Sequence, residues 1–371
     1  MGLPRRGLAC RRAPGTLPPN DVTTVTSSLD AEEGSRAAVN VNTSLRGLAA
    51  AGAALLVGAC GSGSGGPGAG GGPGGEQSGT PASEHAASGS GQQPVPTDAE
   101  DWQGVTDALG RQGKVMGGTV YRVGFPRGDL KVTSYGVQVK PGLALGSYAA
   151  FARYPDGQNL AMGDLVVTEK ELPKVTDALH KSGIDQTAVH KHLLAHEPQI
   201  WWTHFHASGK NAEMIAQGLK TALDATGTPP PAEPASPGPI DLDTQTIDKA
   251  LGAKGTNDGG IYKFSFARNQ TVTAHGKVLP PATGVTTAIN FQPTGDGKAA
   301  INGDFAMTAG EVQNVIEVLR SGGIDIVELH NHALDDNPRL FYLHFWAVDD
   351  AAKLARTLGQ AVDEQDVKPV G

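Results

Sequence analysis

The sequence predicts an α+β fold made of two tandem repeats, each an antiparallel or mixed sheet with helices packed on one face. Motifs recur at a constant spacing of 140 residues in the C-terminal part of the 371-residue chain. Within each copy, strand-like alternation and helical periodicity are mixed without a regular strand–helix–strand order. A proline-rich stretch separates the copies. We therefore expect repeat 1 over residues 101–226, a linker over 227–239 and repeat 2 over 240–371.

Residues 1–59 are typical of an export segment. The apolar run 48–59 follows Arg46 and is shorter than the roughly 20 residues that a membrane-spanning helix needs, so it fits a signal peptide. It ends in Val57-Gly58-Ala59-Cys60, which resembles a bacterial lipobox and predicts a lipid on the Cys60 thiol. The stretch before the run is longer and more polar than a signal peptide requires, which indicates that translation begins further along the chain.

The composition after the export segment indicates a tether and a cellular location. Residues 60–100 are mostly Gly, Ser, Pro and Gln, which cannot bury a core, and we expect a flexible tether there. The predicted location is therefore outside the cytoplasm, anchored by lipid to the outer face of the cytoplasmic membrane or the cell envelope.

Cysteine count and charge argue against two kinds of site. Cys10 and Cys60 are the two cysteines, which argues against thiolate zinc sites and disulfides in the repeats. A net charge of −8 without a basic stripe argues against nucleic-acid binding.

The first elements of the two copies correspond. Each begins with a short helix, predicted over Trp102–Leu109 and Thr246–Leu251. Strands follow, such as Gly260–Phe266, in which apolar residues alternate. A Thr-x-x-Glu capping box then starts a helix, at Thr168–Glu171 and again at Thr308–Glu311.

The later elements also recur. The capped helices carry apolar residues at helical spacing and should end at Gly183 and Gly323. Two strands that bracket a proline-containing loop come next, and an amphipathic helix closes each copy, predicted over Ala351–Val362 in the second. Asp164 and Asp304 precede the capped helices, and we interpret them as residues that shape the turn.

Histidines gather in the two strands that bracket the loop. In the second copy, Glu328, His330 and His332 alternate and should share one face of a strand. If the next strand pairs with it as a hairpin, His344 comes within reach. The candidates in the first copy are His190, His192, His204 and His206. These candidates are seven of the eleven histidines and lie in two short windows, which favours a metal or ligand role.

This arrangement suits a divalent transition metal, since imidazole is a ligand for Zn, Cu, Fe and Ni. Glu328 would be a further ligand or a base acting on metal-bound water. Two alternatives remain open. Histidine and glutamate can act as acid and base without a metal, or the histidines are satisfied by polar neighbours and recur only because the fold recurs.

The motifs resemble a known family. Glu328-Leu329-His330-Asn331-His332 and Leu343-His344-Phe345-Trp346, duplicated behind a lipobox, are similar to the LppY/LpqO-type lipoproteins of mycobacteria and other actinobacteria. The resemblance covers residues 101–371, and the first copy departs from the pattern at Lys191 and His206. It implies export, surface anchoring and a duplicated domain of unknown function, without a substrate or catalytic residues.

Three function hypotheses follow from the sequence. The leading one is a lipid-anchored extracytoplasmic protein with histidine-lined sites that bind a metal or a small ligand. The second is a metal-dependent enzyme with Glu328 as base and His330, His332 and His344 as metal ligands. The third is a structural or partner-binding envelope lipoprotein. Whether the repeats form one site or two stays open.

Overall fold

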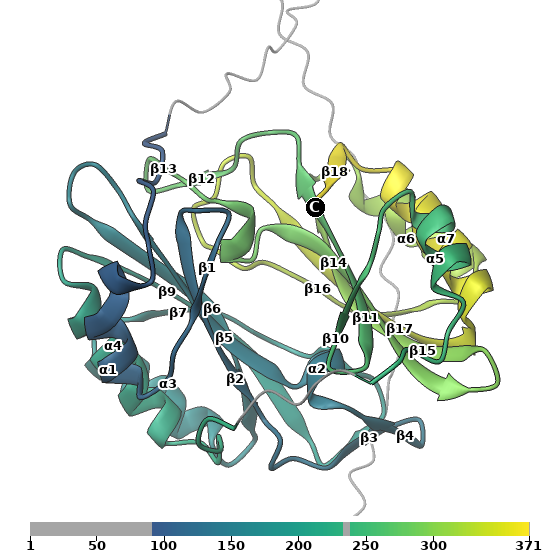
Figure 1. The fold of residues 1–371 in the computed structure, drawn as a ribbon, viewed down its shortest axis with the longest axis horizontal. Coiled ribbons are helices and arrows are strands. Elements are labelled where there is room, and N and C mark those ends of the chain that lie inside the picture. Colours follow the sequence, from purple (N-terminus) through teal and green to yellow (C-terminus); the bar gives the residue numbers. More distant parts are fainter. Residues whose placement is uncertain (1–90, 233–237, 371) are drawn as a thin grey trace, which may run out of the picture. The chain divides into compact units, whose positions relative to one another are not determined.

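The computed structural model describes residues 91–232 and 238–370, which belong to one compact unit (Figure 1). The predicted export segment, Cys60 and most of the predicted tether lie outside the described residues. Within those residues, no helix is both long enough and apolar enough to cross a membrane.

The first copy is an antiparallel sheet covered by helices on one face. The strand order across the sheet is β1 (Lys114–Met116), β2 (Val120–Pro126), β5 (Gly146–Arg153), β6 (Asn159–Thr168), β9 (Ile200–Gly209) and β7 (Asp185–His190). Its helices are η1 (Glu100–Trp102), α1 (Gln103–Leu109), α2 (Pro141–Ala144), α3 (Leu172–Lys181) and α4 (Ala212–Asp224). A small second sheet contains β3 (Val132–Ser134), β4 (Val137–Val139) and β8 (His196–Glu197).

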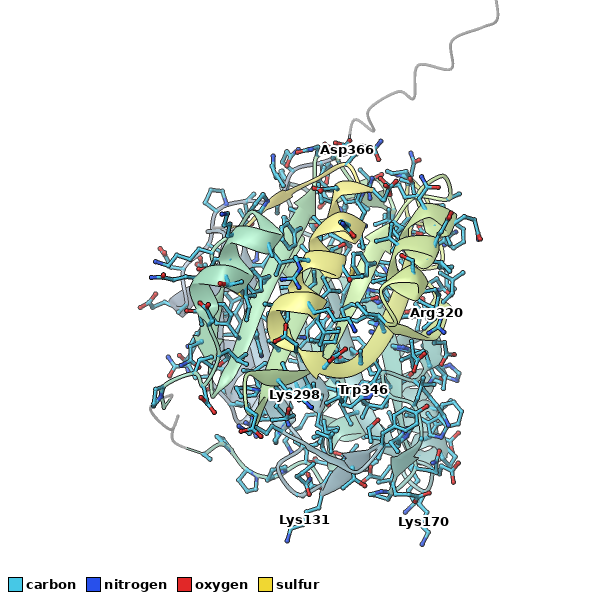
Figure 2. The ribbon with its side chains drawn as sticks, turned by 90° about the vertical axis from the view of Figure 1, so that its right-hand side faces the viewer. Lys131, Lys170, Lys298, Arg320, Trp346 and Asp366 are labelled. Carbon is cyan, nitrogen blue, oxygen red and sulfur yellow. The ribbon has the colours of Figure 1, made fainter. Side chains whose placement is uncertain are left out.

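The second copy repeats this arrangement. Its strand order is β10 (Thr256–Asp258), β11 (Ile261–Arg268), β14 (Thr286–Gly295), β15 (Lys298–Met307), β17 (Phe341–Asp350) and β16 (Asp325–His330), with β18 (Val367–Pro369) beside β11. The remaining elements are α5 (Thr244–Leu251), β12 (Thr273–Ala274), β13 (Lys277–Val278), η2 (Pro281–Thr283), α6 (Val312–Ser321) and α7 (Ala351–Asp363). Figure 2 shows the helices of this copy side by side over their sheet. The predicted fold class is confirmed.

The predicted helix signals are present in the structure. The Thr168 backbone N–H donates to the Glu171 carboxylate at 2.8 Å, and the Glu171 N–H donates to the Thr168 hydroxyl at 3.3 Å, which is a capping box just before α3. In the second copy the Thr308 N–H donates to Glu311 at 2.7 Å. Gly183, at the end of α3, has a φ of 67°, a left-handed conformation that glycine adopts without strain.

The two sheets pack against each other. Each copy has its own core between sheet and helices. Two further apolar clusters combine residues of both copies, one with Met162 and Tyr342 and the other with Trp202 and Trp346. The layers are therefore helices, sheet, sheet and helices, with the inner faces of the sheets in contact (Figure 1).

The start of the described chain lies against this unit. The Gln92 N–H donates to the Gly276 carbonyl at 2.9 Å, and the Val95 N–H donates to the Arg153 carbonyl at 2.8 Å. The tether predicted over residues 60–100 therefore ends earlier than its composition indicated, because these backbone amides have partners in both copies.

Candidate metal centre

Six imidazoles gather between the two sheets, three from each copy. They belong to His190, His192, His204, His330, His332 and His344. Ring centroids are 4.0 Å apart for His190 and His330. They are 3.8 Å apart for His192 and His344, and also for His204 and His332. The histidine groups of the two copies, which the sequence left as one site or two, therefore meet in a single cluster.

The predicted hairpin positions these side chains. β16 pairs with β17 antiparallel, with Glu328 opposite His344 and His330 opposite Tyr342. The strand ends at His330, however, so His332 lies in the following loop rather than on the strand. The Thr187 hydroxyl of the other copy donates to the His332 carbonyl at 2.6 Å, which fixes that loop at the interface.

Two aspartates complete the cluster. Asp164 on β6 lies opposite His204, and Asp304 on β15 lies opposite His344. The Asp304 carboxylate is 3.0 Å from Nε2 of His332, and the Asp164 carboxylate is 3.2 Å from Nε2 of His192. The interpretation of these aspartates as turn residues was wrong, because β6 and β15 continue for three or four residues beyond them.

Backbone carbonyls orient three of the rings, and for His332 the partner of Nδ1 is the Gly284 carbonyl at 3.0 Å. Nδ1 of His204 lies 3.1 Å from the Gly163 carbonyl, and Nδ1 of His344 lies 2.7 Å from the Gly303 carbonyl. A carbonyl only accepts, so Nδ1 carries the proton and Nε2 keeps its lone pair. Metal-ligating histidines are held in this way in known metal sites.

The inward-facing polar atoms of the cluster have no hydrogen-bond partner within the described residues. They are Nε2 of His192, His204, His332 and His344, both ring nitrogens of His190 and His330, and one carboxylate oxygen each of Asp164 and Asp304. The short contacts of Asp164 and Asp304 to the rings do not have hydrogen-bond geometry. An unpartnered buried polar group costs about 1–3 kcal/mol, so these atoms are arranged for something other than packing.

Their spacing suits a metal. Ring nitrogens of His190, His192 and His344 lie within 4.8 Å of one another, and so do those of His190, His204 and His330. These groups can hold a metal ion, and each draws on both copies.

Burial keeps several imidazoles of the cluster neutral. It lowers the pKa of His204 and His332 to about 3, and neighbouring imidazoles add to the effect. Burial also lowers the pKa of His190 and His330 well below the usual value. The pKa of Asp304 rises to about 7 for the same reason, since burial penalises the charged carboxylate. At neutral pH the rings of His190, His204, His330 and His332 therefore present lone pairs rather than positive charges.

Two predicted site residues lie apart from this cluster. The Glu328 carboxylate accepts a hydrogen bond from the Lys191 backbone N–H at 2.8 Å and so joins the copies beside the cluster. The His206 ring packs against His275, with centroids 5.1 Å apart. The role of Glu328 as base stays a prediction. Asp164 and Asp304 were recognisable only as residues conserved between the copies, without a motif of their own.

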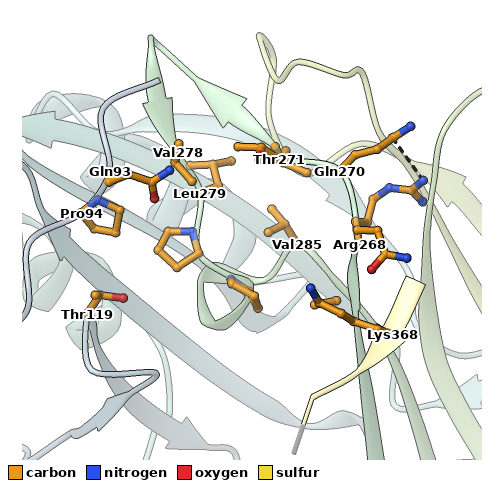
Figure 3. Close-up of a pocket in the computed structure, with 15 residues that line it drawn as sticks. Gln93, Pro94, Thr119, Arg268, Gln270, Thr271, Val278, Leu279, Val285 and Lys368 are labelled. Atoms are coloured by element: carbon orange, nitrogen blue, oxygen red, sulfur yellow. Dashed lines mark hydrogen bonds between the residues drawn. The ribbon is translucent and has the colours of Figure 1, made fainter. Parts of the chain in front are cut away.

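A cavity of about 930 Å³ reaches the cluster from the surface. Its inner wall includes His192, His204, His332, His344 and both aspartates. Arg111, Arg122, Lys140 and Lys263 also line it, and Lys263 is paired with Asp258 at 2.7 Å. A small molecule therefore has a route to the imidazoles, past several positive charges. A second cavity, of about 370 Å³, contains none of these cluster residues (Figure 3).

A family model matches the chain twice. The model described as "Domain of Unknown Function (DUF1259)" matches residues 103–225 and again residues 245–364. The duplication predicted from the sequence is thus confirmed, whereas the resemblance to LppY/LpqO-type lipoproteins stays a prediction. No curated protein matches the chain.

Solved structures give only distant likenesses. The trimeric bacterial microcompartment shell protein PduB is 12% identical, with 68% of this chain and 92% of that chain covered and a TM-score of 0.18. EtuB from Clostridium kluyveri is 10% identical, with 69% and 94% covered and a TM-score of 0.17. An unknown protein from Galdieria sulphuraria is 13% identical, with 58% and 98% covered and a TM-score of 0.16. TM-scores this low carry no argument about fold or function.

Proposed function

The chain belongs to the family described as Domain of Unknown Function (DUF1259), and we propose that its two copies of that domain together bind a transition-metal ion. The ligands come from the six histidines of the interface, with Asp164 and Asp304 as carboxylates close by. The function is then that of a metal-binding protein in which one centre needs both copies.

One observation carries this proposal. Six imidazoles, four buried and two partly buried, are packed at centroid distances down to 3.8 Å, and their inward nitrogens have no hydrogen-bond partner within the described residues. If the histidines only filled the core, these nitrogens would be a net cost, whereas a bound cation satisfies those that ligate it. The carbonyls of Gly163 and Gly303 support the same conclusion, because they orient two rings as in known metal sites.

The donor set defines the class of metal. Neutral imidazoles with carboxylates suit Zn, Cu, Fe or Ni. Hard cations such as Ca²⁺ and Mg²⁺ take oxygen ligands and fit poorly among so many nitrogens.

Metal content tests the proposal. The full chain, produced without a histidine tag and purified in detergent, is measured by inductively coupled plasma mass spectrometry beside His190→Ala/His330→Ala. His180→Ala, on the exposed side of α3, is the control. We expect near-stoichiometric metal in the wild type and the control and its loss in the double variant. No metal in the wild type after incubation with Zn, Cu, Fe and Ni, or equal metal in the double variant, would contradict the proposal.

A second candidate function is supported by the cavity. Since it connects solvent with four of the histidines, a small substrate can reach a metal held there, and the basic lining favours an anionic one. In that case Asp304 is better placed than Glu328 to act as a base, because the Glu328 carboxylate already accepts from the Lys191 amide. An enzyme would lose turnover in Asp304→Asn even when enough metal is added to saturate the variant, and Glu328→Gln is the matched comparison.

The place of action is proposed from the sequence. The lipobox ending at Cys60 and the resemblance to LppY/LpqO-type lipoproteins support a lipid anchor outside the cytoplasm. Labelling of cells with a radioactive fatty acid tests it. The label should be found on the wild type and on Cys10→Ser and be absent from Cys60→Ser. Fatty-acid label that persists on Cys60→Ser, or its absence from the wild type, would contradict a lipid on Cys60.

A further inference from the structure

We propose a second, solvent-accessible site for a divalent transition metal, formed by His206, His275 and Asp335. It is separate from the interfacial histidine centre and does not depend on it. His206 lies on β9 of the first copy, whereas His275 and Asp335 come from loops of the second. A metal there would bind to both copies at the surface.

The three side chains converge. Ring nitrogens of His206 and His275 and a carboxylate oxygen of Asp335 lie within 4.8 Å of one another. The Asp335 carboxylate is 2.7 Å from Nδ1 of His275 and also accepts from the His275 backbone N–H at 3.1 Å. A surface cavity lined by His275, Asp335 and Asn337 opens beside them.

An unpartnered nitrogen of His206 indicates a ligand independently of the spacing of the three side chains. Its side chain is 4% exposed, and its Nε2 has no hydrogen-bond partner among the described residues. The two other side chains are open to solvent, at 54% exposure for His275 and 37% for Asp335. The site thus has one buried, unpartnered nitrogen and two accessible donors, which leaves positions for water or an exchanging ligand.

The fold does not require these residue types. In the internal repeat, Tyr135 corresponds to His275, Ala195 to Asp335 and Trp346 to His206. Tyr135 and His275 share a left-handed backbone, with φ of 46° and 51°. The same backbone turn is therefore built with a tyrosine in one copy and a histidine in the other. Metal-ligating chemistry is found in one of the two equivalent places, so packing alone does not explain it.

Two imidazoles and one carboxylate are a known ligand set for divalent transition metals. With three protein ligands, a catalytic zinc site keeps a further position for water, and open two-histidine-one-carboxylate sites also hold iron. We use Zn²⁺ as the probe because it has no redox chemistry and accepts variable geometry.

Zinc binding to the full chain tests the site. The detergent-purified protein is equilibrated with Zn²⁺ by dialysis, and bound zinc is measured for the wild type, His275→Ala and Asp335→Asn. Tyr135→Ala, the equivalent position in the other copy, is the matched control. We expect both site variants to bind about one zinc ion fewer per chain than the wild type and the control. Because all these positions are at least partly exposed, unchanged circular dichroism should confirm that the variants fold.

A second background separates this site from the interfacial centre. In His190→Ala/His330→Ala, the further change His275→Ala should again remove about one zinc ion per chain, whether or not the interfacial centre binds metal. If His275→Ala and Asp335→Asn bind as much zinc as the wild type in both backgrounds, the second site does not exist. A wild type that binds no zinc would overturn it as well.

Discussion

At the scale of single residues, two glycines orient two of the histidines. The carbonyls of Gly163 and Gly303 accept from Nδ1 of His204 and His344, and the strands approach too closely there for a side chain. A Cβ on Gly303 would lie 2.1 Å from the Ala288 carbonyl oxygen. Gly303 therefore lets β15 lie close to β14, and its carbonyl orients the ring of His344.

Gly303→Ala should be costly for this reason. We expect a loss of at least about 1–3 kcal/mol in the free energy of unfolding, because the added methyl overpacks the sheet. Metal affinity should fall too, since the His344 ring is displaced. Denaturant unfolding measures the first effect and metal content the second. Gly310→Ala is the control, since nothing lies within 4 Å of a Cβ there. Equal stability of Gly303→Ala and the wild type would contradict this reading of the strand contact.

Asp304 should have opposite effects on metal-free and metal-bound protein. Burial raises the pKa of Asp304 to about 7 in the metal-free protein, so the fold resists its charged form above that pH. At pH 8, Asp304→Asn should therefore raise the melting temperature of the metal-free protein and weaken metal binding. Thermal unfolding with and without metal measures both. A variant that is less stable without metal would show that the carboxylate has a structural role instead.

At the scale of elements, a buried ion pair fixes the start of each capped helix. Arg268 on β11 is paired with Glu311 at 2.8 Å and also donates to the Ala306 carbonyl at 3.0 Å. In the first copy Arg127 and Glu171 are paired at 2.9 Å. The capping glutamate therefore holds the helix against the strand that carries the aspartate of the metal centre.

Loss of this pair should be strongly destabilising. Glu311→Ala leaves the Arg268 guanidinium buried without its partner, which typically costs about 3–5 kcal/mol. Glu317→Ala, on the exposed side of α6, should stay within about 0.5 kcal/mol of the wild type. Urea unfolding compares them. A small effect of Glu311→Ala would mean that the arginine finds water or another partner.

Local signals predicted the elements well. The capping boxes, the glycine at the end of α3 and the hairpin that brings His344 to Glu328 and His330 are all present, since each depends on neighbours in sequence or on one turn. The end of β16 was not predictable, because His332 leaves the strand to bond with Thr187 of the other copy.

At the scale of the whole molecule, pH should act through the buried imidazoles. Burial lowers the pKa of His204 and His332 to about 3, against 6.5 for an exposed histidine. Between these values the unfolded chain binds more protons than the folded one, so stability falls as the pH falls. Asp304, with its pKa raised to about 7, opposes this as a single group. We expect the melting temperature of the metal-free protein to drop steadily from pH 6.5 towards pH 4, and a flat profile would contradict the neutral, buried cluster.

The shared centre could not be read from the sequence. The repeat of 140 residues shows that two histidine groups exist, but nothing local indicates that the inner faces of the sheets meet and place His190 against His330. For the same reason Asp164 and Asp304 were undervalued, since each reaches the cluster through pairing with a distant strand. The sequence favoured Glu328 as a base because it lies two residues before His330. Its hydrogen bond from the Lys191 backbone N–H joins the two copies, so it cannot be inferred from one copy alone.

The measurement that tests the account most directly is anomalous diffraction from crystals of the chain purified with its own metal. The data are collected above and below the absorption edge of the metal found. We predict an anomalous peak between the sheets, about 2.0–2.2 Å from ring nitrogens of histidines from both copies. Two results would contradict the central claim that the two copies form one metal centre. One is a cluster without such a peak and with water on the ring nitrogens, and the other is a metal bound by one copy alone.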